Sequence, residues 1–172
     1  MIICNPNAGF YEFIYYQNEW LDYYLTMGVH VFVWNYRGFG RTKGTPDPYN
    51  ICKDAEAVYY HIKQEMKIAR VGVHGESLGG NVACHLARKV DVDFLFADRT
   101  FSSLDKVVQS KSNKCIMYLL KFVTFCWSME AAENYVFARC YKVVANAYND
   151  EIISDLSSLK NGVSEKIIEL EL

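Results

Sequence analysis

Several features are scarce or missing in this sequence, and each absence excludes a class of protein. The six cysteines are scattered without a Cys-x-x-Cys pair, so the sequence predicts neither a zinc site nor a disulfide framework. The net charge is only −2, which gives no support for nucleic acid as a partner. No motif calls for a cofactor, and we expect none.

Long hydrophobic runs are also missing. The longest apolar stretch, residues 115–127, is interrupted by Lys121 and is too short to span a bilayer. Residues 1–4 run straight into a strand-like segment without the pattern of a signal peptide. Several cysteines lie in apolar runs, which is typical of buried free thiols in a reducing compartment. We therefore expect an intracellular protein, in the cytoplasm or attached to the cytoplasmic side of a membrane.

What the sequence does contain is enough apolar material for a core. It has 172 residues, of which 51% are hydrophobic. That is sufficient for one globular domain. With no internal repeat or low-complexity linker, we expect a single domain over residues 1–172.

A Gly-x-Ser-x-Gly motif, Gly75 to Gly79, stands between a β-branched run and a helix-like segment, residues 81–89. In that order the motif predicts a nucleophile elbow, in which Ser77 is lifted on a sharp turn. Gly75 and Gly79 would supply the room that a strained backbone needs. The alternative is an ordinary turn or a phosphate loop, but neither a Gly-x-Gly-x-x-Gly pattern nor a Walker lysine is present.

Strand-like and helix-like segments alternate along the chain, which predicts a mostly parallel sheet with helices on both faces. Ligands bind outside the carboxyl ends of such strands, where the loops 5–9 and 146–150 and the Ser77 turn would meet. The expected strands begin near residues 2, 29, 71, 92 and 141, and the expected helices cover residues 11–27, 51–66, 81–89 and part of 156–172. Two further segments, residues 104–110 and the strongly apolar residues 114–129, follow the fourth strand.

The chain resembles the α/β-hydrolase superfamily, and within it the lipase- and depalmitoylase-like serine hydrolases. The resemblance rests on five motifs in the expected order: Asn7-Ala8-Gly9, residues 35–41, Gly75 to Gly80, residues 98–104 and residues 149–153. It implies an α/β-hydrolase-like sheet of about five strands, from which the N- and C-terminal flanks of the fold are missing. We therefore expect a fragment of a longer hydrolase or a naturally shortened relative.

The resemblance also implies roles for particular residues. Ser77 matches the nucleophile, and Asp150 matches the acid that orients the catalytic histidine, with Asp98 as the alternative acid. The N–H of Leu78 would be one oxyanion donor. The other would come from the first loop, from Asn7 or from Ala8.

The histidine of such a triad is not found. In this fold it follows the acid, but all four histidines, His30, His61, His74 and His85, precede Asp150. Our first hypothesis is a serine hydrolase of acyl esters or thioesters, nearly inactive as this chain alone. The second is a catalytically inactive scaffold or a subunit of a larger assembly.

Three further expectations concern the insertion, the membrane and a protein partner. Residues 104–139 form an insertion that would be a lid or cap over an acyl-chain site, although a core helix explains its apolar run equally well. A lipid-like substrate would bring the protein to a membrane surface as a peripheral contact. A sheet edge left bare beside the Val29 segment would be covered by a partner protein.

Overall fold

A computed structural model describes residues 1–13, 20–103, 105–107, 129–150 and 152–171. Its centre is a four-stranded sheet whose strands lie side by side in chain order. These strands are β1 (Ile2–Cys4), β2 (Gly72–Glu76), β3 (Phe94–Asp98) and β4 (Tyr141–Ala145), and every neighbouring pair is parallel. The parallel α/β sheet predicted from the sequence is confirmed.

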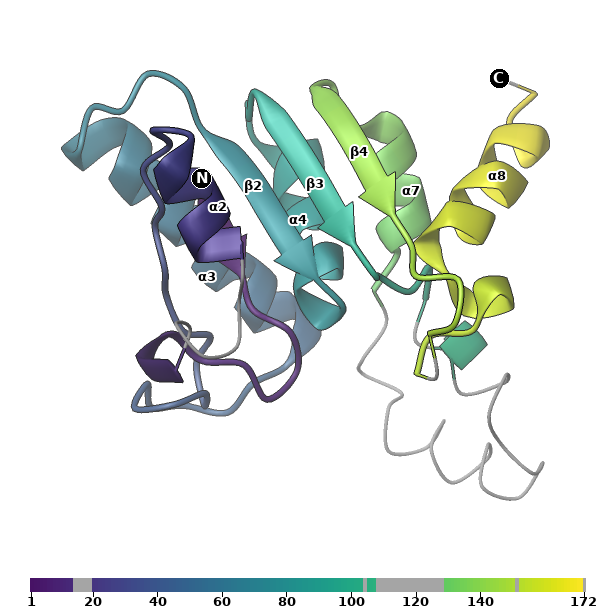
Figure 1. Cartoon of the computed structure of the whole chain (residues 1–172), viewed down its shortest axis with the longest axis horizontal. Coiled ribbons are helices and arrows are strands. Elements are labelled where there is room, and N and C mark those ends of the chain that lie inside the picture. The colour runs from purple at the N-terminus through teal and green to yellow at the C-terminus, as the bar shows by residue number, and fades with distance from the viewer. Residues whose placement is uncertain (14–19, 104, 108–128, 151, 172) are drawn as a thin grey trace.

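The register brings the strand ends together at one edge. Glu76 pairs with Asp98, and Asp98 pairs with Ala145. Because all strands run in the same direction, their carboxyl ends and the loops that follow them lie along this single edge (Figure 1). It is the edge at which the sequence places the Ser77 turn.

Only part of the expected second strand forms. Phe32 makes one bridge to Ile2, with Phe32 N–H donating to the Met1 carbonyl at 2.8 Å and Ile3 N–H donating to the Phe32 carbonyl at 3.0 Å. The prediction of a strand over residues 29–34 is thus reduced to one bridge beside β1. The reason is that β1 has only three residues and offers little edge to pair with.

Two helices form where the sequence predicts them, but their first and last residues differ from the predicted ranges. Within the expected helix 11–27, the described part is a 3₁₀ turn, η1 (Tyr11–Phe13), and α2 (Trp20–Thr26), while residues 14–19 lie outside the described residues. Gly28 follows α2 with φ of +74°, as expected of a helix-ending glycine. The next helix, α3 (Pro48–Tyr60), continues as a π-helical turn, η2 (His61–Glu65). It begins before residue 51 because Asp47 caps it and proline suits its first turn.

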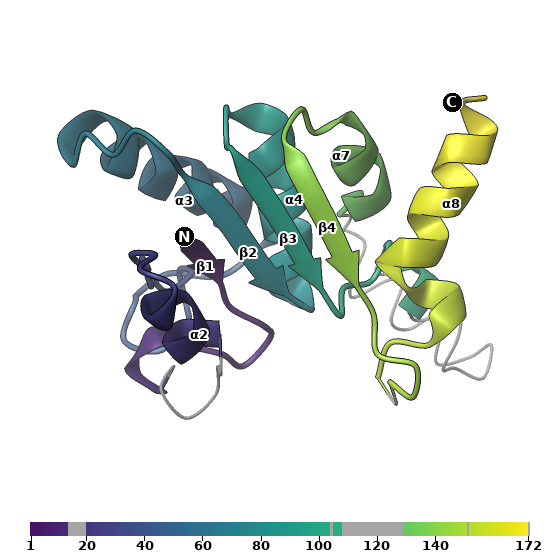
Figure 2. The same cartoon turned by 45° about the horizontal axis from the view of Figure 1, so that its top comes forward.

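The core lies between the sheet and the helices behind it. Helices α3, α4 (Leu78–Lys89) and α7 (Ala131–Phe137) cover one face, whereas α2 covers part of the other (Figures 1 and 2). Val73 and Leu95 point from the strands into this core and are completely buried, as are Val82 and Leu86 of α4. Burial of such side chains contributes about 1.5–3 kcal/mol each relative to exposure.

The last part of the chain packs at the far end of the sheet. A 3₁₀ turn, η3 (Asp155–Ser157), leads into α8 (Leu159–Glu169), which confirms a partly helical tail. Helix α7 was not expected from the sequence. Most of the expected lid, residues 108–128, lies outside the described residues, so its role stays a prediction. No described helix combines the length and apolarity that a membrane crossing requires.

Candidate functional site

Ser77 occupies a strained turn between a strand and a helix. β2 ends at Glu76 and α4 begins at Leu78, and between them Ser77 has φ of +53° and ψ of −117°. A left-handed φ is costly for a residue with a side chain. The Ser77 side chain makes no capping hydrogen bond to α4, so the ordinary task of a serine at a helix start does not explain it.

The neighbouring glycines are required by close backbone contacts. A Cβ atom on Gly75 would lie 2.0 Å from the carbonyl oxygen of Gly79, and one on Gly79 would lie 1.9 Å from that of Cys4. A Cβ on Gly80 would lie 1.7 Å from Thr100 Oγ1. All three are far inside van der Waals contact, so the turn forms only with glycine at these positions.

The loop after β1 lies directly against this turn. The Cys4 and Asn5 carbonyls both crowd Gly79, and the loop is anchored because Asn5 Nδ2 donates to the Trp34 carbonyl at 2.7 Å. Asn7 is exposed within the loop. Leu78 is the first residue of α4, where an N–H has no partner within the helix. The structure brings the two expected donor segments together, and their roles as oxyanion donors stay predictions.

The two candidate acids differ in burial and in the partners of their carboxylates. Asp98 has only 7% of its side chain exposed, and its Oδ2 accepts hydrogen bonds from Arg99 Nε at 3.1 Å, Arg99 Nη2 at 2.8 Å and Trp20 Nε1 at 3.3 Å. Asp150 is half-buried, and its Oδ1 accepts from the N–H groups of Ile152 and Ile153, both at 2.8 Å. In each residue these bonds go to one oxygen, but Asp98 is nearly buried and paired with a guanidinium, whereas Asp150 is half-buried and its bonds fix its own loop.

Two of the four histidines are held by other partners. The His74 ring stacks on Phe96 at 4.5 Å, and its Nδ1 lies 3.2 Å from Tyr24 Oη. Burial lowers the pKa of His74 to about 4. His85 Nε2 lies 2.8 Å from Glu56 Oε1 on α3. Both rings are held by these partners, and the expectation that neither serves Ser77 stays a prediction.

One contact that the sequence did not suggest joins Glu76 to Arg99, with Oε1 and Nη2 3.0 Å apart. Burial raises the pKa of the Glu76 carboxyl, and the nearby guanidinium lowers it. The sequence carries no local signal for the bridge between Arg99 and Glu76, because Glu76 ends β2 and Arg99 follows β3.

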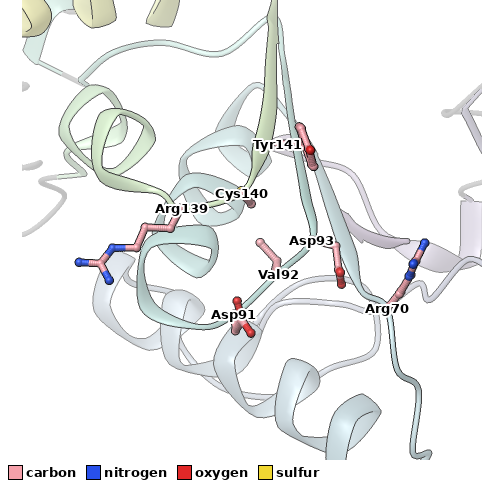
Figure 3. Close-up of a pocket in the computed structure, with 7 residues that line it drawn as sticks. All are labelled: Arg70, Asp91, Val92, Asp93, Arg139, Cys140 and Tyr141. Carbon is pink, nitrogen blue, oxygen red and sulfur yellow. The ribbon is translucent and has the colours of Figure 1, made fainter. Parts of the chain in front are cut away.

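A hollow of about 570 Å³ lies away from this turn, at the amino ends of β3 and β4. Its lining includes Arg70 and Arg139, whose side chains point away from each other (Figure 3). A second hollow of about 540 Å³, mostly apolar, lies beside residues 29–32. Neither is lined by Ser77 or Asp150, so we do not place the chemistry in them.

Comparisons with known proteins agree with this fold. A family model described as "Serine aminopeptidase, S33" matches residues 9–163. An uncharacterized membrane protein of Saccharomyces cerevisiae, YNL320W, is 33% identical over 113 residues, which cover 63% of this chain and 38% of that protein. The lysophosphatidylserine lipase ABHD12 of Danio rerio is 29% identical over 107 residues, 59% of this chain and 28% of that protein.

Among solved structures, esterase Pf2001 of Pyrococcus furiosus matches with a TM-score of 0.73 and 19% identity, over 95% of this chain and 66% of that one. An α/β hydrolase from Vibrio vulnificus matches with a TM-score of 0.73 and 19% identity, over 99% of this chain and 61% of that one. These structures share the fold. The chain spans well under half the length of the curated relatives named above.

Proposed function

Since the chain belongs to the serine aminopeptidase S33 family of α/β hydrolases, we propose that it is a serine hydrolase that cleaves an acyl ester or thioester through Ser77. Ser77 Oγ would attack the carbonyl carbon of the substrate and form a tetrahedral oxyanion. The N–H of Leu78 and a donor of the Asn7 loop would stabilise that oxyanion. Collapse would release the alcohol or thiol, and water would then release the acyl group from Ser77.

The observation that carries this proposal is the conformation of Ser77. A serine held at φ of +53° between β2 and α4, with glycines packed to contact on either side, costs free energy. Such a turn is the geometry in which a nucleophile elbow exposes its hydroxyl. Strain of this kind persists where the surrounding structure over-determines it, which favours a functional explanation.

Asp150 is our choice for the acid. Its two backbone hydrogen bonds fix the loop after β4 and go to a single oxygen, which suits a carboxylate that must also orient an imidazole. Asp98 is a poorer choice because its side chain is nearly buried and its carboxylate is already paired with the charged Arg99. The base is a histidine other than the four of this sequence.

The test is covalent labelling of Ser77 by a fluorophosphonate probe. We expect slow labelling of the 172-residue chain, faster labelling when imidazole is added as an external base, and none in Ser77→Ala. Ser164→Ala, which removes an exposed hydroxyl of α8, is the matched control and should label like the parent chain. Absence of labelling in the parent chain with imidazole would contradict the proposal.

The alternative is a binding module or subunit that keeps the fold without catalysis. The histidine positions favour it, since His74 packs under α2 and His85 pairs with α3. A folded chain that no acyl or phosphonate probe modifies, even with imidazole, would support this alternative.

The substrate class and setting are parts of the same proposal. An acyl or lipid-like substrate is supported by the relatives named as an esterase and a lysophosphatidylserine lipase. The free thiols of Cys4, Cys52 and Cys84 are buried, which supports a reducing compartment on the cytoplasmic side. The yeast relative is named as a membrane protein, which supports peripheral membrane contact.

The bare sheet edge is a further part of the proposal. Residues 29–33 contain three valines and are mostly half-buried, and the apolar hollow of about 540 Å³ lies beside them. An edge with so little charge invites pairing with another chain. We propose that a protein partner covers it in the assembled protein.

A further inference from the structure

Two strained turns lie side by side at the carboxyl ends of neighbouring strands. Ser77 after β2 has φ of +53°, and Arg99 after β3 has φ of +43°. A hydrogen bond joins them, since Ser77 N–H donates to the Asp98 carbonyl at 3.0 Å. The end of β3 is therefore the direct backbone support of the Ser77 turn.

The bend at Arg99 lets its side chain turn back onto the residue before it. Successive side chains of a strand point to opposite faces, so Asp98 and Arg99 would not normally meet. Here Arg99 Nε and Nη2 donate to Asp98 Oδ2 at 3.1 and 2.8 Å. The carboxylate is buried, and a buried charge without compensation is costly.

Arg99 also connects the end of β3 to the strands on either side, β2 through its guanidinium and β4 through its backbone N–H. Arg99 Nη2 lies 3.0 Å from Glu76 Oε1, next to Ser77 in the chain. Arg99 N–H donates to the Ala145 carbonyl at the end of β4, at 3.0 Å. Hydrogen bonding to Asp98 and the charges of Glu76, Asp98 and Asp150 raise the pKa of Arg99. The carboxylates of Glu76 and Asp98, at the ends of β2 and β3, thus share one cation.

We propose that Arg99 is a positioning residue for the site: its guanidinium compensates Asp98 and Glu76 and thereby holds the Ser77 turn against the end of β3. The proposed function enters only in giving Ser77 its catalytic task. Arg99 does not act on the substrate. Its effect reaches Ser77 through the two carboxylates and through the hydrogen bond from Ser77 N–H to Asp98.

If Arg99 acts through its charge, its removal should change the pKa of Glu76, which a loss of packing alone would not do. Burial and the charge of Asp98 raise the pKa of Glu76, and Arg99 opposes them. Without Arg99, two neighbouring carboxylates would face each other uncompensated, and Glu76 would take up a proton at higher pH. Among the described residues, His74 and Tyr24 also interact electrostatically with Asp98, and Asp150 interacts with Arg99.

The test compares Arg99→Met and Arg99→Lys with the control Arg88→Met, which removes a guanidinium that pairs with Glu133 at 2.8 Å on the helical face. Two readouts need no activity: the pKa of Glu76 from ¹³C NMR of its carboxyl, and the hydrogen exchange rate of the Ser77 amide. Arg99→Met should raise the pKa of Glu76 and speed exchange at Ser77 about tenfold.

The conservative variant separates charge from geometry. Arg99→Lys should keep the pKa of Glu76 near that of the parent but still speed exchange at Ser77, because an ammonium lacks the planar fork. Arg88→Met should change neither. An unchanged Glu76 titration and unchanged Ser77 exchange in Arg99→Met would overturn the proposal, and if that variant does not fold, unchanged exchange in Arg99→Lys would do so.

Failure of the proposed function would look different. A chain whose Ser77 is never labelled by a fluorophosphonate would refute the hydrolase, whereas the titration of Glu76 and the exchange of Ser77 would still decide whether Arg99 holds the turn. If labelling occurs, Arg99→Met should also shift its pH profile, since the ionisation of Glu76 changes beside the nucleophile.

Discussion

The two ends of the central sheet differ in how much room they leave for an added Cβ atom and in how strained their backbone is. At the carboxyl ends, Gly75 and Gly79 have no room for a Cβ atom, and Ser77 and Arg99 adopt left-handed backbone. At the amino ends, a Cβ on Gly72 would meet only the flexible side chain of Met1, at 3.0 Å, and the side chain of Phe94 at 3.4 Å. Three of the described non-glycine residues with left-handed backbone, Ala8, Ser77 and Arg99, follow strands at the end that carries the candidate site, where neighbouring turns can hold such strain in place.

The largest difference in stability should be found between two single substitutions in β2, Gly75→Ala near its carboxyl end and Gly72→Ala at its amino end. Gly75→Ala should lower the free energy of unfolding by at least about 3 kcal/mol, because the new Cβ would overlap the Gly79 carbonyl and backbone cannot move aside cheaply. Gly72→Ala should change it by less than about 1 kcal/mol, because the Met1 side chain can rotate. Urea unfolding measures both, and equal losses would remove the contrast between the ends.

The free energy of unfolding should depend on pH through His74, which lies in the middle of β2. Burial lowers the pKa of His74 to about 4 from its ordinary value of 6.5, so between these values only the unfolded chain takes up the proton. The free energy of unfolding should therefore be highest above pH 6.5 and fall by about 3 kcal/mol as the pH drops to 4. In His74→Phe this fall should be absent from the urea-unfolding profile. The same slope in both proteins would place the titration elsewhere.

A smaller effect should reveal the strain at Ser77 itself. Glycine tolerates φ of +53° and alanine does not, so Ser77→Gly should be more stable than Ser77→Ala by about 1 kcal/mol. At Ser164 in α8 the order should reverse, by a similar amount, because glycine weakens a regular helix. Thermal unfolding of the four variants would test this, and the same order at both positions would argue against strain.

The smallest effect should be found at the amino end of β4. Tyr141 is 86% exposed there, so Tyr141→Thr should leave the free energy of unfolding within about 0.5 kcal/mol of the parent. Threonine is a good strand former, and little apolar area leaves the core. A larger loss in urea unfolding would mean that this end of the sheet is less tolerant than its exposure indicates.

Local sequence signals correctly predicted elements that depend mainly on their own residues. The run Tyr141–Ala145 forms β4, which begins where the sequence predicts a strand, and Gly28 follows α2 in a left-handed conformation. Helix α7 was not predicted because only two of its residues, Ala131 and Tyr135, are buried. Two buried positions are too few to show the apolar repeat of a helix in the sequence. Residues 29–34 have strand composition but make a single bridge, because pairing depends on the length of the neighbouring strand.

By itself, the sequence determined the Ser77 turn, since a serine between glycines, after a β-branched run and before a helix, is a local pattern with one favourable geometry. Only the tertiary structure decided what surrounds it. The register that pairs Glu76 with Asp98 sets their carboxylates around Arg99, and a one-residue slip would send them to opposite faces. Contacts between strands depend on register, which no segment of the chain encodes alone.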